Sequence, residues 1–208
     1  MAVSARTGPD SDAAFVVKSL ASPSEFQEIF VRHARTVNRY FARRVGADVA
    51  EELVAEVFLA AFRIRDRYDP ARADVRPWLF GISSNVLARH RRDEARYWKM
   101  RASLGTEPSE SLTPADEADE RVAAQAERPR LIAALRRLRK VDREVLLLFA
   151  WEGLSYDEIA EALGIPVGTV RSLLSRSRRQ LRDALGADPR AESALPTLDE
   201  LLNGEVSG

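Results

Sequence analysis

Apolar residues recur every three to four positions through most of the chain, which is the spacing of amphipathic α-helices. No segment alternates apolar and polar residues as a half-buried strand would. Three apolar stripes lie in the first half of the chain and two more precede residue 150. Their members are Phe26, Ile29, Phe30, Val37, Tyr40 and Phe41; Leu53, Val57, Phe58, Ala61 and Phe62; Trp78, Leu79, Ile82, Val86 and Leu87; Leu131, Leu135 and Leu138; and Val145, Leu148 and Phe149. The pattern predicts an all-α fold.

Breaks in this pattern predict two small helical domains joined by a flexible acidic linker. Residues 1–24 are rich in small and polar residues, which favours a mobile N-terminal arm with a weak turn of helix near Phe15. Residues 25–101 form the first domain. Residues 102–129 carry three prolines and seven acidic side chains, so we expect a solvated linker. Residues 130–186 form the second domain, and an acidic tail covers residues 187–208.

The second domain carries a helix-turn-helix pattern. Ser155 is placed to cap a helix over residues 156–163, and Glu158, three residues later, completes a capping box. Gly164 permits a tight turn, and Pro166 fits just before the next helix, which we expect over residues 167–185.

This last helix has two unlike faces. One is apolar and should pack against the domain: Val170, Leu174, Ser177, Leu181 and Leu185. The other is polar, slim near its start and cationic along its length: Gly168, Arg171, Ser172, Ser175, Arg176 and Arg179. A helix that enters the major groove needs short side chains for close approach and arginines for bases or phosphates. A solvated basic face is the plainer alternative.

Charge is segregated although the formal net charge is zero. Residues 89–101 hold six basic side chains against Asp93 and Glu94, and residues 171–182 hold five arginines and no acid. The segregation favours a basic nucleic-acid-binding face. The chain has no cysteine, and His33 and His90 are isolated, so we expect no metal, no cofactor and no enzyme. No apolar run approaches a membrane span, and we expect a cytoplasmic protein without membrane insertion.

Two longer segments carry a specific resemblance. "AEELVAEVFLAAFR" followed by "RPWLFGISSNVLARHRRDEAR" resembles region 2 of bacterial sigma factors. "LRKVDREVLLLFAWEGLSYDEIAEALGIPVGTVRSLLSRSRRQLRDAL" resembles their region 4. With no third domain between them, the chain is similar to the extracytoplasmic-function (ECF) group over residues 25–101 and 130–186. The resemblance implies a subunit that brings core RNA polymerase to promoter DNA and helps to open the strands.

The resemblance also implies partners and site residues. The polymerase contacts would be the clamp helices of the largest subunit, met by Glu51, Glu52, Leu53 and Glu56, and the flap of the second-largest subunit. An anti-sigma factor is expected as a regulator. The −35 element would be read by Gly168, Thr169, Arg171, Ser172, Ser175, Arg176 and Arg179. Leu173 departs from the arginine that many relatives carry.

For the −10 element, the loop of residues 68–75 and Asn85 would capture a flipped base. Tyr68 would supply an aromatic wall and Asn85 a polar rim. Asn85 could instead cap or bridge helices, and the acids at 51–56 could be a solvated face. Arg89, Arg92 and Arg96 would follow phosphates, whereas Trp78 is better explained as a core residue. Two other classes remain open: a helix-turn-helix regulator that acts without being a polymerase subunit, and a protein-binding adaptor.

Overall fold

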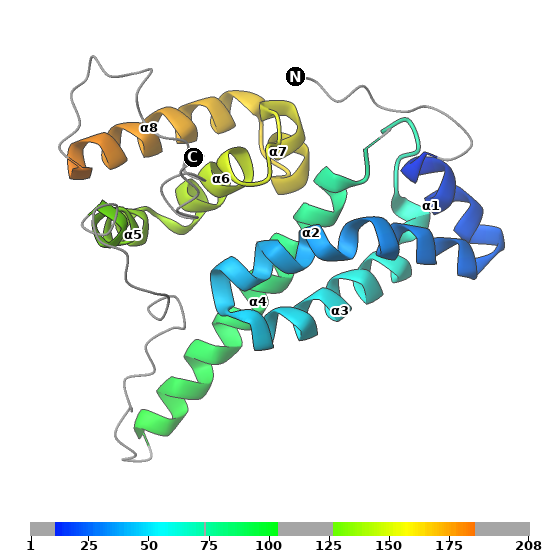
Figure 1. The fold of residues 1–208 in the computed structure, drawn as a ribbon, viewed down its shortest axis with the longest axis horizontal. Coiled ribbons are helices and arrows are strands. Elements are labelled where there is room, and N and C mark those ends of the chain that lie inside the picture. The colour runs from blue at the N-terminus through cyan, green and yellow to red at the C-terminus, as the bar shows by residue number, and fades with distance from the viewer. Residues whose placement is uncertain (1–10, 73, 104–126, 186–208) are drawn as a thin grey trace, which may run out of the picture. The chain divides into compact units, whose positions relative to one another are not determined.

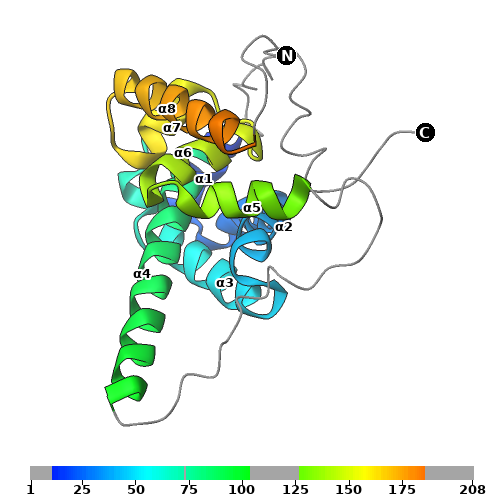
Figure 2. The ribbon, with the colours of Figure 1, turned by 90° about the vertical axis from the view of Figure 1, so that its left-hand side faces the viewer.

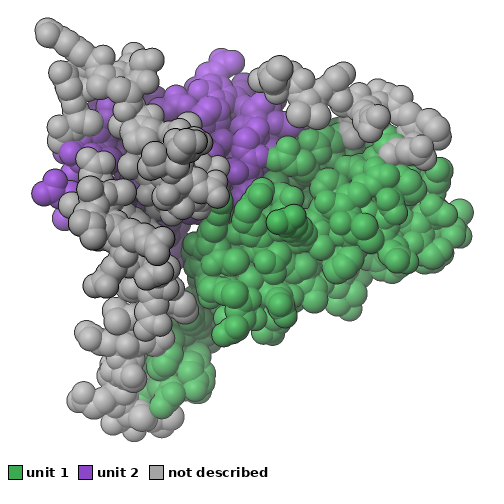
Figure 3. Space-filling model, viewed as in Figure 1, with its two compact units in different colours: residues 1–117 green, residues 118–208 purple. Residues whose placement is uncertain are grey.

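The computed structural model of the protein describes residues 11–72, 74–103 and 127–185 (Figure 1). The chain divides into two compact units, residues 1–117 and 118–208 (Figure 3). Within the described ranges the regular structure is entirely helical, with eight α-helices and two short 3-10 helices, which confirms the all-α fold. Most of the predicted linker and the whole of the predicted tail lie outside the described residues.

The first unit is built around three long helices. Its elements are α1 (Asp12–Ala21), the 3-10 helix η1 (Pro23–Phe26), α2 (Gln27–Val45), α3 (Ala47–Arg63), the 3-10 helix η2 (Arg65–Arg67) and α4 (Arg76–Ser103). Helices α2 and α3 lie side by side, joined at Gly46, whose φ of 85° reverses the chain in one residue. Tyr40 lies at the centre of the core, with its ring 5.0 Å from that of Phe41 and 5.5 Å from that of Phe80.

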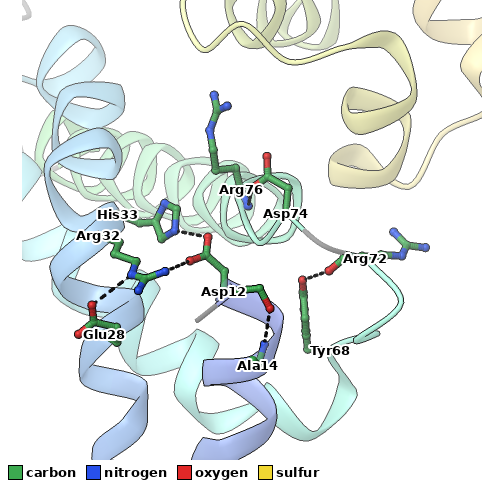
Figure 4. Close-up of polar contacts among 10 residues, drawn as sticks. Asp12, Ala14, Glu28, Arg32, His33, Tyr68, Arg72, Asp74 and Arg76 are labelled. Atoms are coloured by element: carbon green, nitrogen blue, oxygen red, sulfur yellow. Dashed lines mark hydrogen bonds and ion pairs between the residues drawn. The ribbon is translucent and has the colours of Figure 1, made fainter. Parts of the chain in front are cut away.

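Helix α1 differs from the mobile arm that the sequence predicts for residues 1–24. Ser11 caps the helix by accepting from the Ala14 amide at 3.2 Å, and Val16 and Ser19 are buried. Asp12 pairs with two side chains of α2: its carboxylate lies 3.1 Å from Arg32 Nη1 and 2.7 Å from His33 Nε2 (Figure 4). These contacts join residues about twenty positions apart, and composition alone does not reveal them.

Helix α4 has a packed half and a projecting half. Leu79, Phe80, Val86 and Leu87 are buried against the bundle. From residue 88 to residue 100 no side chain is buried, and this half extends beyond the ends of α2 and α3 (Figures 1 and 2). The basic segment of α4 therefore projects from the packed helices of the first unit.

The second unit packs three helices around a fourth. They are α5 (Glu127–Arg137), α6 (Lys140–Ala150) and α7 (Tyr156–Leu163), and each contacts α8 (Val167–Leu185). The core holds Leu131, Leu148, Leu154, Ile159 and Leu174, all nearly inaccessible to solvent.

The local signals of the helix-turn-helix are confirmed. The Ser155 amide donates to the Glu158 carboxylate at 2.6 Å, and the Glu158 amide donates to the Ser155 hydroxyl at 3.3 Å. Gly164 adopts the left-handed conformation, with φ 64° and ψ 34°, and ends α7. The capping box and this glycine therefore set both ends of α7 where the sequence predicts them.

Candidate DNA and polymerase interfaces

Helix α8 presents most of the predicted DNA-reading residues on one exposed face. The packed side of the helix consists of Val170, Leu173, Leu174, Ser177 and Leu181. The exposed members of the predicted set are Gly168, Thr169, Arg171, Ser172, Ser175 and Arg179. Leu173 belongs to the core, so this position packs the helix instead of reaching outward.

Space around the start of α8 is open. A Cβ atom built on Gly168 would meet no atom of the chain within 4 Å. Ser172 donates its hydroxyl back to the Gly168 carbonyl at 3.0 Å, which folds this short side chain against the helix. Around Gly168 and Ser172 the helix therefore exposes backbone and small side chains, a surface that another molecule can approach closely.

Arg176 is a member of the predicted set whose side chain is bound by another helix of the same unit. Its Nε atom lies 3.1 Å from Oδ1 of Asp142, and its Nη2 atom donates to the same oxygen. Asp142 stands in the first turn of α6 and is completely buried. The sequence prediction missed Asp142, because the two residues are 34 positions apart and no local pattern pairs them.

The loop before α4 is ordered by its own acids. The Asp69 carboxylate accepts from the Ala71 amide at 3.0 Å, and Asp74 accepts from the Arg76 amide at 2.8 Å, close to the start of α4. Both bonds are local, and the second pairs a backbone donor at the start of α4, the helix that carries Asn85. Asn85 itself is exposed, as a residue that meets a ligand must be.

Tyr68 does not present the open aromatic wall that the sequence predicts. Its side chain is buried, and its hydroxyl donates to the Arg72 carbonyl (Figure 4). Its ring centroid lies 5.2 Å from that of Trp78. Trp78 is half-buried in this contact, so it packs against Tyr68 without lying in the fully buried core. In the sequence, an aromatic residue next to a proline-containing loop fits an open binding pocket and a packed core equally well. In the structure, the ring of Tyr68 is packed.

The basic segment of α4 is exposed and partly paired. Arg89, Arg92 and Arg96 are all exposed. Arg89 forms an ion pair with Glu56 of α3, and Arg96 lies 3.5 Å from Asp93 one turn earlier. The structure thus joins a predicted phosphate contact, Arg89, to a predicted polymerase contact, Glu56.

The outer face of α3 is both acidic and apolar. Glu51 and Glu52 are exposed, but Leu53 is buried in the core, so its side chain is not at the surface as a direct polymerase contact would be. Leu59 lies two turns after Glu52 on the same face and is half-exposed. Phe30 of α2 is also exposed and packs its ring 4.9 Å from Phe58 of α3. Sequence periodicity assigns Phe30 to the core and gives no sign that its ring is exposed beside the buried Phe58.

Among the helices that the structure describes, none is both long enough and apolar enough to cross a membrane.

Comparison with known protein families matches both units. The family model for sigma-70 region 2 matches residues 27–97, and that for sigma-70 region 4 matches residues 128–181. The RNA polymerase sigma factor CarQ of Myxococcus xanthus is 33% identical over 162 residues, which cover 77% of this chain and 89% of CarQ. The RNA polymerase sigma factor CnrH of Cupriavidus metallidurans is 35% identical over 174 residues, covering 78% and 87%.

Solved structures give the same result. CnrH in complex with the cytosolic domain of CnrY has a TM-score of 0.59 and 28% identity, covering 86% of this chain and 99% of CnrH. The sigma factor RpoE in complex with the anti-sigma factor NepR from Bartonella quintana has a TM-score of 0.57 and covers 79% and 99%. At 24% identity, the likeness to RpoE supports the fold alone.

Proposed function

Because the chain belongs to the ECF group of RNA polymerase sigma factors, we propose that its two units divide the reading of a promoter between them. A sigma factor is not an enzyme: the polymerase carries out the chemistry, and the sigma subunit directs it to promoter DNA. The observation that carries this proposal is that each unit has an exposed basic surface. In the second unit it is the slim, cationic face of α8, and in the first unit it is the projecting half of α4.

The second unit would read the −35 element through α8. Gly168 and Ser172 would let the start of the helix approach the groove, while Arg171 and Arg179 project from the same face about two turns apart. Arginine is suited to both tasks of such a helix, because it pairs with guanine edges and with phosphates.

The first unit would hold the −10 element along α4. Asn85 would supply the polar contact to an extruded base, and Arg92 and Arg96 would follow phosphates toward the projecting end. Asn85 and Arg96 are eleven residues apart, which is about 16 Å along a helix. The basic segment therefore reaches several nucleotides from the proposed base contact.

Core polymerase would dock on the outer face of α3. Glu51 and Glu52 would supply exposed carboxylates, and Leu59 and Phe30 would supply exposed apolar side chains. The carboxylates would make the contact selective, and the apolar side chains would be buried when polymerase binds. The second unit would contact the flap of the second-largest polymerase subunit.

An anti-sigma factor would compete for the first unit. The exposed large apolar side chains on α1, α2 and α3 are Val17, Leu20, Phe30, Val31 and Leu59. Exposed apolar side chains in this number are typical of a surface that a partner covers. We place the protein in the cytoplasm, where polymerase and promoter are.

Run-off transcription with core polymerase tests the function. We expect promoter-specific product only when chain, core and promoter are all present, and strong loss with Arg171→Ala plus Arg179→Ala. Asn85→Ala should keep core binding yet reduce permanganate reactivity of the melted strand. A chain that binds duplex promoter tightly without core, and adds nothing to transcription with it, would instead be a separate helix-turn-helix regulator.

A further inference from the structure

Asp142 is a buried residue of the second unit that binds two arginines, Arg139 and Arg176. Its side chain has no exposed surface, and its Oδ2 atom accepts from Arg139 Nε at 2.6 Å. Its Oδ1 atom accepts from Nε and Nη2 of Arg176. The Ser177 hydroxyl also lies within hydrogen-bonding distance of the Asp142 carbonyl, at 3.3 Å. One residue of α6 thus contacts two successive residues of α8.

The two bonds from Arg176 use one particular edge of its guanidinium group. That group carries five N–H donors in a rigid plane. With the Nε and Nη2 edge turned toward Asp142, one hydrogen on Nη1 and one on Nη2 point along the terminal edge. This terminal edge is the one that can donate two parallel bonds to O6 and N7 of guanine.

The terminal edge has a route to the surface. The Arg176 side chain keeps 33% of its exposure despite the contact with a fully buried carboxylate. On α8 it lies one turn after Ser172 and one turn before Arg179, both exposed. Arg176 is therefore bound at its inner edge and accessible on the recognition face.

We propose that Asp142 is a positioning residue that holds Arg176 in the orientation needed to read one guanine of the −35 element. The inference rests on the proposed function of α8 and deepens it. A long arginine side chain loses rotamer entropy when it is immobilised at an interface. The buried carboxylate fixes the side chain before DNA arrives, so less of that cost falls on binding. A guanidinium plane that is fixed in one orientation can also donate two bonds only to a base whose acceptor atoms lie in matching positions.

A double-mutant cycle in the holoenzyme tests this role. Affinity is measured for the promoter and for a set of promoters in which each −35 base pair is replaced in turn. Arg176→Ala should reduce discrimination at one guanine by about 5- to 150-fold. Asp142→Ala should lose discrimination at the same base pair only. The double variant should be no worse than Arg176→Ala, because Asp142 acts through Arg176.

Two further variants serve as controls. Asp142→Asn keeps a hydrogen-bond acceptor but removes the charge, so we expect an intermediate loss of discrimination at the same base pair. This variant is used in place of Asp142→Ala if thermal unfolding shows that the alanine variant does not fold. Asp183→Asn removes the same charge from an exposed position of α8 and should leave the discrimination profile unchanged.

The proposal is overturned if the losses from Asp142→Ala and Arg176→Ala add, or if the former loss is spread over all base pairs. It is also overturned if Arg176→Ala leaves every base preference intact. In each of these cases the proposed function is still supported if the wild-type holoenzyme selects the promoter. Only failure of the wild-type holoenzyme to select the promoter would remove that function.

Discussion

Gly168 occupies the first turn of α8, where the protein's own packing does not call for a glycine. Alanine is a better helix former than glycine by up to about 1 kcal/mol, and the space beside Gly168 is empty within 4 Å. We attribute the glycine to close approach of DNA. Gly168→Ala should therefore keep or raise the unfolding temperature of the second unit and weaken promoter binding by the holoenzyme, measured by calorimetry and fluorescence anisotropy.

Gly153 provides the matched control for this prediction. The space beside it is also empty, but its φ of +66° disfavours any residue with a Cβ. Gly153→Ala should lower the unfolding temperature, in contrast to Gly168→Ala. Equal destabilisation by both substitutions would show that Gly168 serves the fold and not the interface.

Asp12 makes the packing of α1 sensitive to acid. Burial by itself would raise the pKa of this carboxyl group, but the hydrogen bonds and charges of His33 and Arg32 outweigh burial and lower the pKa below its ordinary 3.8. A lowered pKa in the folded state means that the carboxylate stabilises the fold at pH values above about 4, and that this contribution is lost as the pH falls through the lowered pKa.

We expect the amides of α1 to exchange faster with solvent as the pH is lowered below about 4, after correction for intrinsic exchange. Asp12→Asn should remove this pH dependence and make α1 exchange faster at neutral pH as well. If the variant keeps the acid dependence of the wild type, other carboxyl groups hold the helix in place.

At the scale of the helix, α7 depends on signals within a few residues and α1 on contacts across the unit. The reciprocal bonds of Ser155 and Glu158 form a local capping box. Ser155→Ala should lower the free energy of unfolding of the second unit by about 1 kcal/mol, because it leaves a backbone donor of the first turn unpaired. Denaturant titration followed by circular dichroism measures this.

Glu158→Gln is the control, because glutamine can also complete a capping box. Its effect should be clearly smaller than that of Ser155→Ala. A larger effect would indicate that the charge of Glu158 at the helix N-terminus, rather than the box, stabilises α7.

At the scale of the whole molecule, the two units have separate cores. Leu148→Ala removes a fully buried side chain of the second unit and should cost about 2–5 kcal/mol there. Because Leu148 belongs to the core of the second unit, the transition of the first unit should not move. Differential scanning calorimetry of the full chain should resolve two transitions, of which only one shifts; a single transition shifting as a whole would mean that the units unfold together.

The sequence by itself determined most of the helical architecture. Stripes with helical spacing predict both domains, and local caps predict α7 and α8 with the bounds that the structure has. These features are recoverable because helix periodicity, capping boxes and glycine ends act within one or two turns. The order of the two motifs was also enough to identify the family.

Tertiary structure alone decided the details of the candidate sites. Tyr68 and Leu53 were predicted to meet partners but are buried, whereas Phe30 was predicted to be buried and is exposed. Asp142 binds Arg176 and Asp12 binds His33 across 34 and 21 positions. A periodic pattern assigns a residue to a face of its own helix, but burial and pairing depend on which other helix covers that face, and only the packed molecule specifies that.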